Sequence, residues 1–250
     1  MAAPTYQTLD PDKIIETLEK LEKRISARFP GSGLGRVADN LTKTARATSA
    51  TVQKIARPNF TLRVLVGLLI GFFVVVAVML GKRALGLQAS TELTNIVQGL
   101  DAGVSLLVVI GGAAYYLSTV ESRLRNDKAL KALHGIRTIV HVIDMHQLTK
   151  DPSAYGAPVT SASPERHMSP FELQRYLSYC SELLSLTSKV AALYADRLRD
   201  PVVVDAVGDI ERLSSQLSLK MWQKIEFMEE RTQDMPAAPA VYPAIPAATS

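Results

Sequence analysis

The residues best suited to chemistry are histidines and an aspartate that repeat at helical spacing. His134, Arg137, His141 and Asp144 are separated by three, four and three positions, so they share one face of a helix. Imidazole and carboxylate groups on one face are typical ligands for zinc and related metals, and they also serve acid–base chemistry. His146 falls outside this face, and the cation of Arg137 opposes metal binding. We therefore interpret the face as a polar seam between helices, with an interaction surface or a metal-dependent enzyme site at His134, His141 and Asp144 as alternatives.

Two polar strings accompany this face. They read His141-Val-Ile-Asp-Met-His-Gln-Leu-Thr-Lys-Asp-Pro152 and Ser218-Leu-Lys-Met-Trp-Gln-Lys-Ile225. Over about residues 120–231 the chain resembles an uncharacterised group of bacterial two-span membrane proteins, and that resemblance implies no activity and no residue roles. Trp222 lies one step away from the apolar stripe of its segment. It indicates either packing at the edge of a helix interface or an anchor for a protein partner.

Two long apolar stretches predict transmembrane helices at about 62–81 and 100–120, joined by an external loop at 82–99. Val64–Leu80 contains no charged residue, and about 20 residues at about 1.5 Å each cross the hydrocarbon core of a bilayer. Tyr115 and Tyr116 near the end of the second stretch are typical of a headgroup anchor. The apolar parts of the two stretches, Val64–Leu80 and about 102–120, contain no Asp, Glu, Lys, Arg or His, which argues against a proton pump or a coupled transporter.

The distribution of lysine and arginine predicts that both termini are cytoplasmic. The loop carries only Lys82 and Arg83, whereas basic residues are frequent in the flanks of the two stretches. Those predicted to meet lipid headgroups are Arg46, Lys54, Arg57, Arg63, Arg123 and Arg125. This pattern, with no secretory signal before the first stretch, predicts a multi-pass protein of a cell membrane, most consistent with a bacterial inner membrane.

Small residues in the two stretches predict close helix packing. Gly67 and Gly71 form a G-x-x-x-G pair, and Gly103 and Gly111 recur on one face of the second stretch. Such faces pack the hairpin on itself or against other copies.

Residues 1–61 predict two cytoplasmic amphipathic helices with a Gly/Pro linker near 30–35. Asp10-Pro11 starts the first, and its apolar stripe is Ile14, Leu18, Leu21, Ile25 and Phe29. The second, about Arg36–Arg57, has a thin stripe of Val37, Leu41, Ala45, Thr48, Val52 and Ile55. Its basic opposite face fits either an anionic leaflet or packing on other protein helices.

Residues 121–231 predict a cytoplasmic three-helix bundle or coiled coil, followed by a disordered Pro/Ala-rich tail at 232–250. Helical periodicity continues from Glu121 to about Leu148, and Ser169-Pro-Phe-Glu172 and Asp200-Pro201 start two further helices. The turn between the last two helices is very short, so they must be antiparallel neighbours.

Together these features predict an all-α integral membrane protein. The net charge of +4 is too small for a nucleic-acid binder, and the single cysteine, Cys180, reads as a small buried hydrophobe. No phosphate loop, nucleophile elbow or Cys/His cluster occurs. We expect a non-enzymatic scaffold or adaptor that binds lipids and a protein partner or its own copies, with no cofactor, small-molecule substrate or nucleic acid. An oligomeric channel or transport accessory subunit is the alternative.

Overall fold

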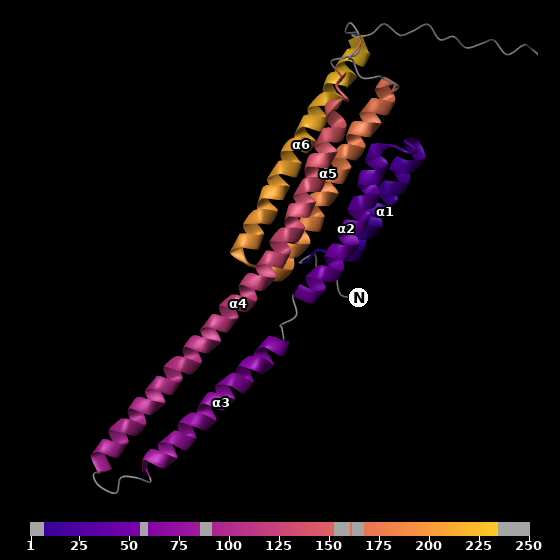
Figure 1. The fold of residues 1–250 in the computed structure, drawn as a ribbon. Helices are drawn as coiled ribbons and strands as arrows, with labels where there is room; N and C mark the ends of the chain where they lie inside the picture. Colours follow the sequence, from indigo (N-terminus) through magenta and orange to yellow (C-terminus); the bar gives the residue numbers. More distant parts are fainter. Residues whose placement is uncertain (1–7, 56–59, 86–91, 153–160, 162–167, 235–250) are drawn as a thin grey trace, which may run out of the picture.

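The computed structural model describes residues 8–55, 60–85, 92–152, 161 and 168–234. These residues form α-helices, and the described ranges contain no strand, which confirms the all-α class (Figure 1). The helices are α1 (Pro11–Arg28), α2 (Gly33–Ile55), α3 (Phe60–Leu85), α4 (Glu92–Leu148), α5 (Pro170–Leu198) and α6 (Pro201–Asp234). Arg57 and most of the 153–167 loop and of the predicted tail lie outside the described residues.

Local sequence signals begin the helices where they were predicted. The Asp10 carboxylate accepts hydrogen bonds from the backbone N–H groups of Asp12 (3.0 Å) and Lys13, and Pro11 is the first residue of α1. At α5 the Ser169 hydroxyl accepts from the Glu172 backbone N–H while the Glu172 carboxylate accepts from the Ser169 backbone, which completes a capping box.

α5 and α6 form an antiparallel pair. Arg199 closes α5 in the left-handed region at φ 47°, and the Asp200 carboxylate accepts a hydrogen bond of 3.0 Å from the Val202 backbone N–H. The chain therefore reverses within two residues, as the sequence predicts.

The bundle contains more helices than the predicted three. α1 packs on α2 and α5, and α2 packs on α5 and on the second half of α4, so that five helices share one apolar core (Figure 1). Phe29 places its ring edge-on to Tyr176 of α5 at 5.4 Å between centroids, and Arg24 pairs with Glu182 of α5 at 2.6 Å. The residues that form the centre of the core include Leu18, Leu21, Ile25, Leu34, Leu41, Ile136, Ile143, Leu177, Leu183, Leu184, Tyr194 and Ile210.

The apolar stripe of α2 is buried in this bundle. Val37, Leu41, Ala45, Thr48, Val52 and Ile55 are all buried. Of the two environments that the sequence left open for this stripe, the structure places it on protein helices.

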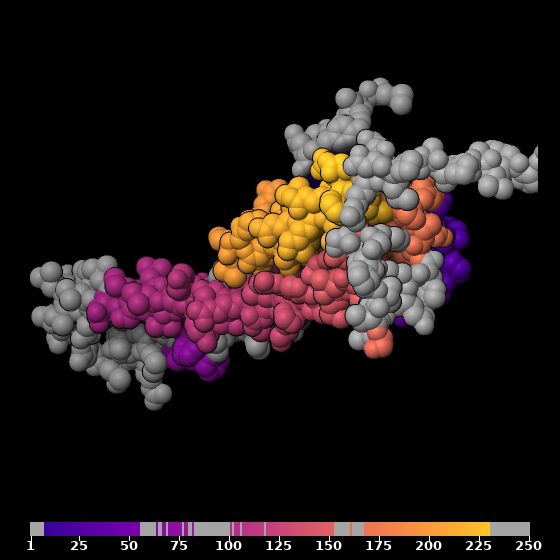
Figure 2. Space-filling view, turned by 90° about the horizontal axis from the view of Figure 1, so that it is seen from above, coloured from indigo at the N-terminus to yellow at the C-terminus, as the bar shows by residue number. Residues whose placement is uncertain are grey.

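α3 and the first half of α4 run side by side and extend away from the bundle (Figure 1). In Figure 2 the first half of α4 forms a narrow projection beyond the bundle. α4 is a single helix of 57 residues, about 86 Å long at about 1.5 Å per residue. α3 continues to Leu85 and α4 begins at Glu92, so helical structure extends into both ends of the predicted external loop at 82–99. The place of this loop outside a membrane stays a prediction.

Candidate membrane segment and interhelical groove

Many of the described apolar side chains of α3 and of the first half of α4 are exposed. Leu107 of α4 is 71% exposed and Leu68 of α3 is 67% exposed, whereas Ile136 in the second half of α4 is fully buried. Leaving such side chains in water costs roughly 25 cal/mol for each Å² of apolar surface. The other large apolar side chains exposed in this region are Val64, Phe72, Phe73, Val75, Val78, Met79, Val104, Val108 and Val109.

One helical stretch among the described residues is long and apolar enough to cross a membrane by length and composition. It begins at Gly103 in α4, and no residue of its apolar window is buried in the protein. A helix that can span a membrane is therefore present where the sequence predicts the second span. The first span, in α3, stays a prediction.

Polar and aromatic groups follow this apolar half at the junction with the bundle. Tyr115 and Tyr116 are 77% and 69% exposed, and Arg123 is exposed about two turns later. Arg125 is half-buried, and Lys54 is exposed near the end of α2. Apolar residues are followed by tyrosines and then by cations. Side chains follow the same order from the hydrocarbon core of a membrane to its headgroups.

The remaining predicted headgroup residues differ in their surroundings. Arg46 pairs with Glu19 of α1 at 2.7 Å, and this carboxylate raises the pKa of Arg46. Arg57 and the side chain of Arg63 lie outside the described residues. The interaction of these residues with lipid stays a prediction.

Open space surrounds the glycines that predict close helix packing. A methyl group added at Gly67, Gly71, Gly103 or Gly111 would meet no neighbouring atom within 4 Å. Another helix could therefore pack against these glycines, and their role in helix packing stays a prediction.

The predicted metal residues do not assemble into a site within the described chain. His134 and His141 are exposed on α4, and the Asp144 carboxylate accepts a hydrogen bond of 2.8 Å from the Gln147 amide. The Lys224 ammonium of α6 donates to the oxygen of the same amide at 2.6 Å. The described residues contain no group of three or more His, Cys, Asp or Glu side chains arranged to hold a metal. Asp144 thus takes part in a polar seam between α4 and α6.

The end of α4 makes a contact that sequence reasoning missed. The imidazole of His146 lies against Gly33, the first residue of α2, where an added methyl carbon would be 2.9 Å from Nδ1 and closer still to Cε1. Burial lowers the pKa of His146, and the charges of Arg36 and Lys150 lower it further. The sequence analysis places Gly33 only in the linker near 30–35. His146 is more than 100 residues away in the sequence, so the residues around Gly33 do not indicate that this imidazole lies against it.

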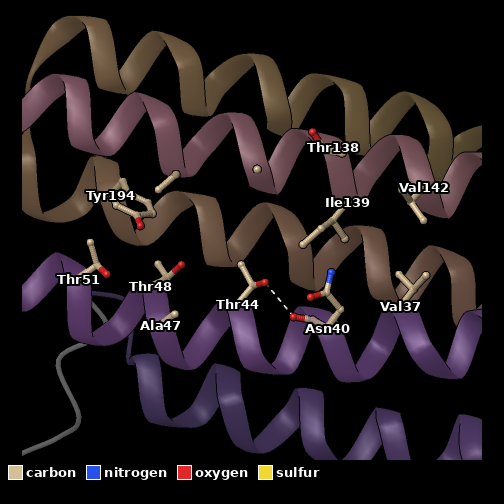
Figure 3. Close-up of a pocket in the computed structure, with 12 residues that line it drawn as sticks. Val37, Asn40, Thr44, Ala47, Thr48, Thr51, Thr138, Ile139, Val142 and Tyr194 are labelled. Carbon is tan, nitrogen blue, oxygen red and sulfur yellow. Dashed lines mark hydrogen bonds between the residues drawn. The ribbon is translucent and has the colours of Figure 1, made fainter.

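A groove of about 480 Å³ runs between α2 and α4, with Tyr194 of α5 at one end (Figure 3). Small side chains line both walls. Thr44 donates a hydrogen bond to the Asn40 carbonyl within α2 (2.8 Å), and Thr138 donates to the His134 carbonyl within α4 (3.0 Å), so both hydroxyls bond within their own helices. The lining residues are Val37, Asn40, Thr44, Ala47, Thr48, Thr51, Ala132, Gly135, Thr138, Ile139, Val142 and Tyr194.

The groove exists because the walls lack bulk. A methyl group added at Gly135 would meet nothing within 4 Å, and Tyr194 is almost fully buried beside Thr48. Burial raises the pKa of Tyr194, while its hydrogen bond with Thr48 opposes that change. The feature of the sequence that could have indicated the groove is a run of small residues at helical spacing in each of two segments, α2 and α4, which are far apart in the sequence.

Trp222 is exposed on the outer face of α6, and 57% of its surface is open. Leu219, one turn earlier, is 60% exposed, so the two side chains form an apolar patch on the bundle. The single cysteine, Cys180, is buried in the core, and burial raises its pKa to about 12. The role of Trp222 as a partner anchor stays a prediction.

The chain matches no protein family, no curated protein and no solved structure. Its function has to be inferred from these residues and their geometry.

Proposed function

We propose that this protein is a membrane-anchored helical scaffold. In this proposal α3 and the first half of α4 cross a cell membrane, as in a bacterial inner membrane, as a hairpin. The five-helix bundle and both termini then lie on the cytoplasmic side, where the bundle presents surfaces to protein partners or to further copies. No catalytic step is part of the proposal.

The observation that carries the proposal is the change of environment along α4. Leu107 and Val108 are largely exposed, while Leu133 and Ile136 of the same unbroken helix lie in the core of the bundle. A bilayer provides the apolar environment that the first half lacks, and its backbone hydrogen bonds are already satisfied within the helix. The helix therefore ties the bundle rigidly to its anchor.

The charges at the junction support the proposed orientation. Lys54, Arg123 and Arg125 lie between the apolar half and the bundle. Each basic residue near an anionic leaflet contributes about 1 kcal/mol of attraction. Their excess over Lys82 and Arg83 at the opposite end supports a bundle on the cytoplasmic side, by the positive-inside rule.

Single-cysteine labelling tests the topology. In a Cys180→Ser background, Lys82→Cys and Ala50→Cys each introduce a thiol at an exposed position, one at the far end of α3 and one on α2. With a membrane-impermeant maleimide, we expect Lys82→Cys to react in intact cells and Ala50→Cys to react only after the membrane is opened. Reaction of Ala50→Cys in intact cells, or release of the protein by alkaline carbonate, would refute the proposed anchoring.

Native mass spectrometry tests the scaffold role. Protein extracted with its surrounding lipid should carry a stoichiometric second protein or further copies of itself. A lone chain with no associated protein, in extracts where labelling has confirmed the topology, would refute the scaffold while leaving the anchor intact.

A further inference from the structure

We infer that the turn between α5 and α6 is a further contact of this protein with the membrane, and that it rests among anionic lipid headgroups beside α4. The inference rests on the proposed function, because the bilayer that the turn meets is the one that α3 and α4 cross. It adds a surface that the sequence analysis did not consider, formed by Arg199, Pro201, Val202 and Val204.

The turn lies at the membrane-facing end of the bundle, which is the end from which α3 and the first half of α4 extend (Figure 1). α5 runs toward this end and α6 runs away from it, so the first turn of α6 is the part of that helix nearest to the apolar half of α4. Helical side chains lean toward the N-terminus of their helix. The side chains of this first turn therefore lean toward the apolar half.

The register of α6 on α4 sets the height of the turn. The Lys224 ammonium donates to the Gln147 amide oxygen at 2.6 Å, and counting back 22 residues along each helix puts Val202 level with Arg125. Arg125 is five residues beyond Val120, the end of the predicted span, and this corresponds to about 8 Å at about 1.5 Å per residue. The headgroup layer on each side of a bilayer is about 5–8 Å deep, so the turn reaches that layer.

A contact between α4 and α5 gives the same height. The Lys150 ammonium, just beyond the end of α4, lies 5.8 Å from the centroid of the Tyr176 ring. Counting 25 residues from this pair toward the membrane-facing end puts Pro201 level with Arg125. Two contacts made by different helices therefore agree on the level of the turn.

The end of α2 lies at this level as well. His146 of α4 contacts Gly33 of α2, and the two helices run in opposite directions. Counting 21 residues along each helix puts Lys54 level with Arg125. The turn thus continues a layer that already contains two of the predicted headgroup residues.

The turn presents apolar side chains to this layer. Val202 is 56% exposed and Val204 is 47% exposed, whereas Val203 between them is fully buried in the core. Pro201 is exposed as well. These side chains gain free energy when they leave water, and the boundary between headgroups and acyl chains accepts apolar side chains that have cations beside them.

The cations of this layer have no partner in the protein. Lys54, Arg123 and Arg199 are exposed, and none of them makes an ion pair within the described ranges. By contrast Arg46, two turns of α2 farther from the membrane-facing end, pairs with a carboxylate of α1. Unpaired cations at headgroup depth attract anionic lipid.

The acidic side chains near the turn do not cancel this attraction. The carboxylates of Asp10 and Asp200 accept hydrogen bonds from the first turns of α1 and α6, and Glu121 is buried. The next acids lie two or three residues farther from the apolar half: Asp12, Asp127 and Asp205.

Quenching of a fluorophore by lipid tests the contact in the full-length protein. In the Cys180→Ser background, Val202→Cys and Leu219→Cys each carry an environment-sensitive fluorophore, in nanodiscs of phosphatidylcholine and phosphatidylglycerol. The lipid carries a nitroxide on its acyl chain near the glycerol. The two positions are matched, since both are aliphatic residues of α6, 56% and 60% exposed.

Leu219 lies about 26 Å farther along α6 than Val202, at about 1.5 Å per residue. We expect the fluorophore at Val202→Cys to lose most of its emission and the one at Leu219→Cys to keep its emission. Equal quenching at the two positions, whether strong or weak, would overturn the inference.

Placing the nitroxide on one lipid at a time tests the preference for anionic headgroups. At equal content, quencher on phosphatidylglycerol should act about twofold more strongly at Val202→Cys than quencher on phosphatidylcholine, because cations enrich anionic lipid around them. Lys54→Gln with Arg199→Gln should remove this excess. The control pair Lys23→Gln with Lys220→Gln removes the same charge from exposed positions far from the membrane-facing end, and should keep it. No excess in the parent protein, or an equal loss in both pairs, would contradict the inference.

The labelling of Lys82→Cys and Ala50→Cys reports independently on the proposed anchor. If that labelling confirms the topology and the fluorophores at Val202→Cys and Leu219→Cys are quenched equally, the contact of the turn is refuted and the anchor stands. If Ala50→Cys reacts in intact cells, the proposed anchoring itself is refuted.

Discussion

Replacing Gly33 with alanine should loosen the attachment of α2 to the end of α4. The added methyl group overlaps the imidazole of His146, so either that ring or the first turn of α2 must move. Overfilling a packed site costs about 1–3 kcal/mol. The lower value applies if the half-buried ring rotates outward, and the upper value if the backbone shifts.

The same substitution has an opposite intrinsic effect. Alanine is the better helix former, by at most about 1 kcal/mol, and less in the first turn. In a chain that also carries His146→Ala the overlap is gone, so Gly33→Ala should leave stability unchanged or slightly raised. The two substitutions should therefore be coupled by about 1–3 kcal/mol.

Thermal unfolding of the four proteins in nanodiscs, followed by circular dichroism, measures this coupling. For a unit of this size, 1 kcal/mol corresponds to about 2–4 °C in Tm. We expect Gly33→Ala to lower Tm by that amount or more with His146 present, and not in its absence. Equal shifts in both backgrounds, with a coupling below about 0.5 kcal/mol, would show that His146 does not cover Gly33.

Three further predictions follow from buried polar groups. The pKa of His146 is lower in the folded protein than its unfolded value of 6.5, so the free energy of unfolding should be highest above pH 6.5 and should fall as the pH drops from there toward the folded pKa. Urea unfolding across this range measures the loss, and His146→Gln should abolish it. Cys180, with its pKa raised to about 12, should react with maleimide only after unfolding, so modification of the folded protein would contradict its burial. Gln147→Ala removes the acceptor of Lys224 and the donor to Asp144, and should cost about 1–3 kcal/mol in thermal melts; the exposed control Leu148→Ala should cost less.

Local signals made the helix starts predictable. Asp10-Pro11, the Ser169–Glu172 box and Asp200-Pro201 each act through hydrogen bonds to residues two or three positions away, so the sequence contains the whole interaction. The apolar stripes were predictable for the same reason, since periodicity reports which face a helix buries.

Long-range contacts were not predictable in this way. A stripe such as that of α1 indicates burial but not the partner, and the packing of Phe29 on Tyr176 joins residues almost 150 positions apart. The groove likewise depends on two runs of small residues meeting across the bundle, and neither run predicts the other. The sequence predicted that Asp144 lies in a polar seam between helices, but not that Gln147 of α4 and Lys224 of α6 form this seam with it.

The unbroken course of α4 makes it a lever. From Val120 to Leu148 the helix extends about 42 Å beyond its apolar half, at about 1.5 Å per residue. When the apolar half lies in a bilayer, its tilt follows the thickness of the hydrocarbon layer. A change in tilt of about 10° would swing the far end of the bundle by about 7 Å, because no hinge interrupts α4 between them. A change in the thickness of the bilayer would therefore move the far end of the bundle sideways.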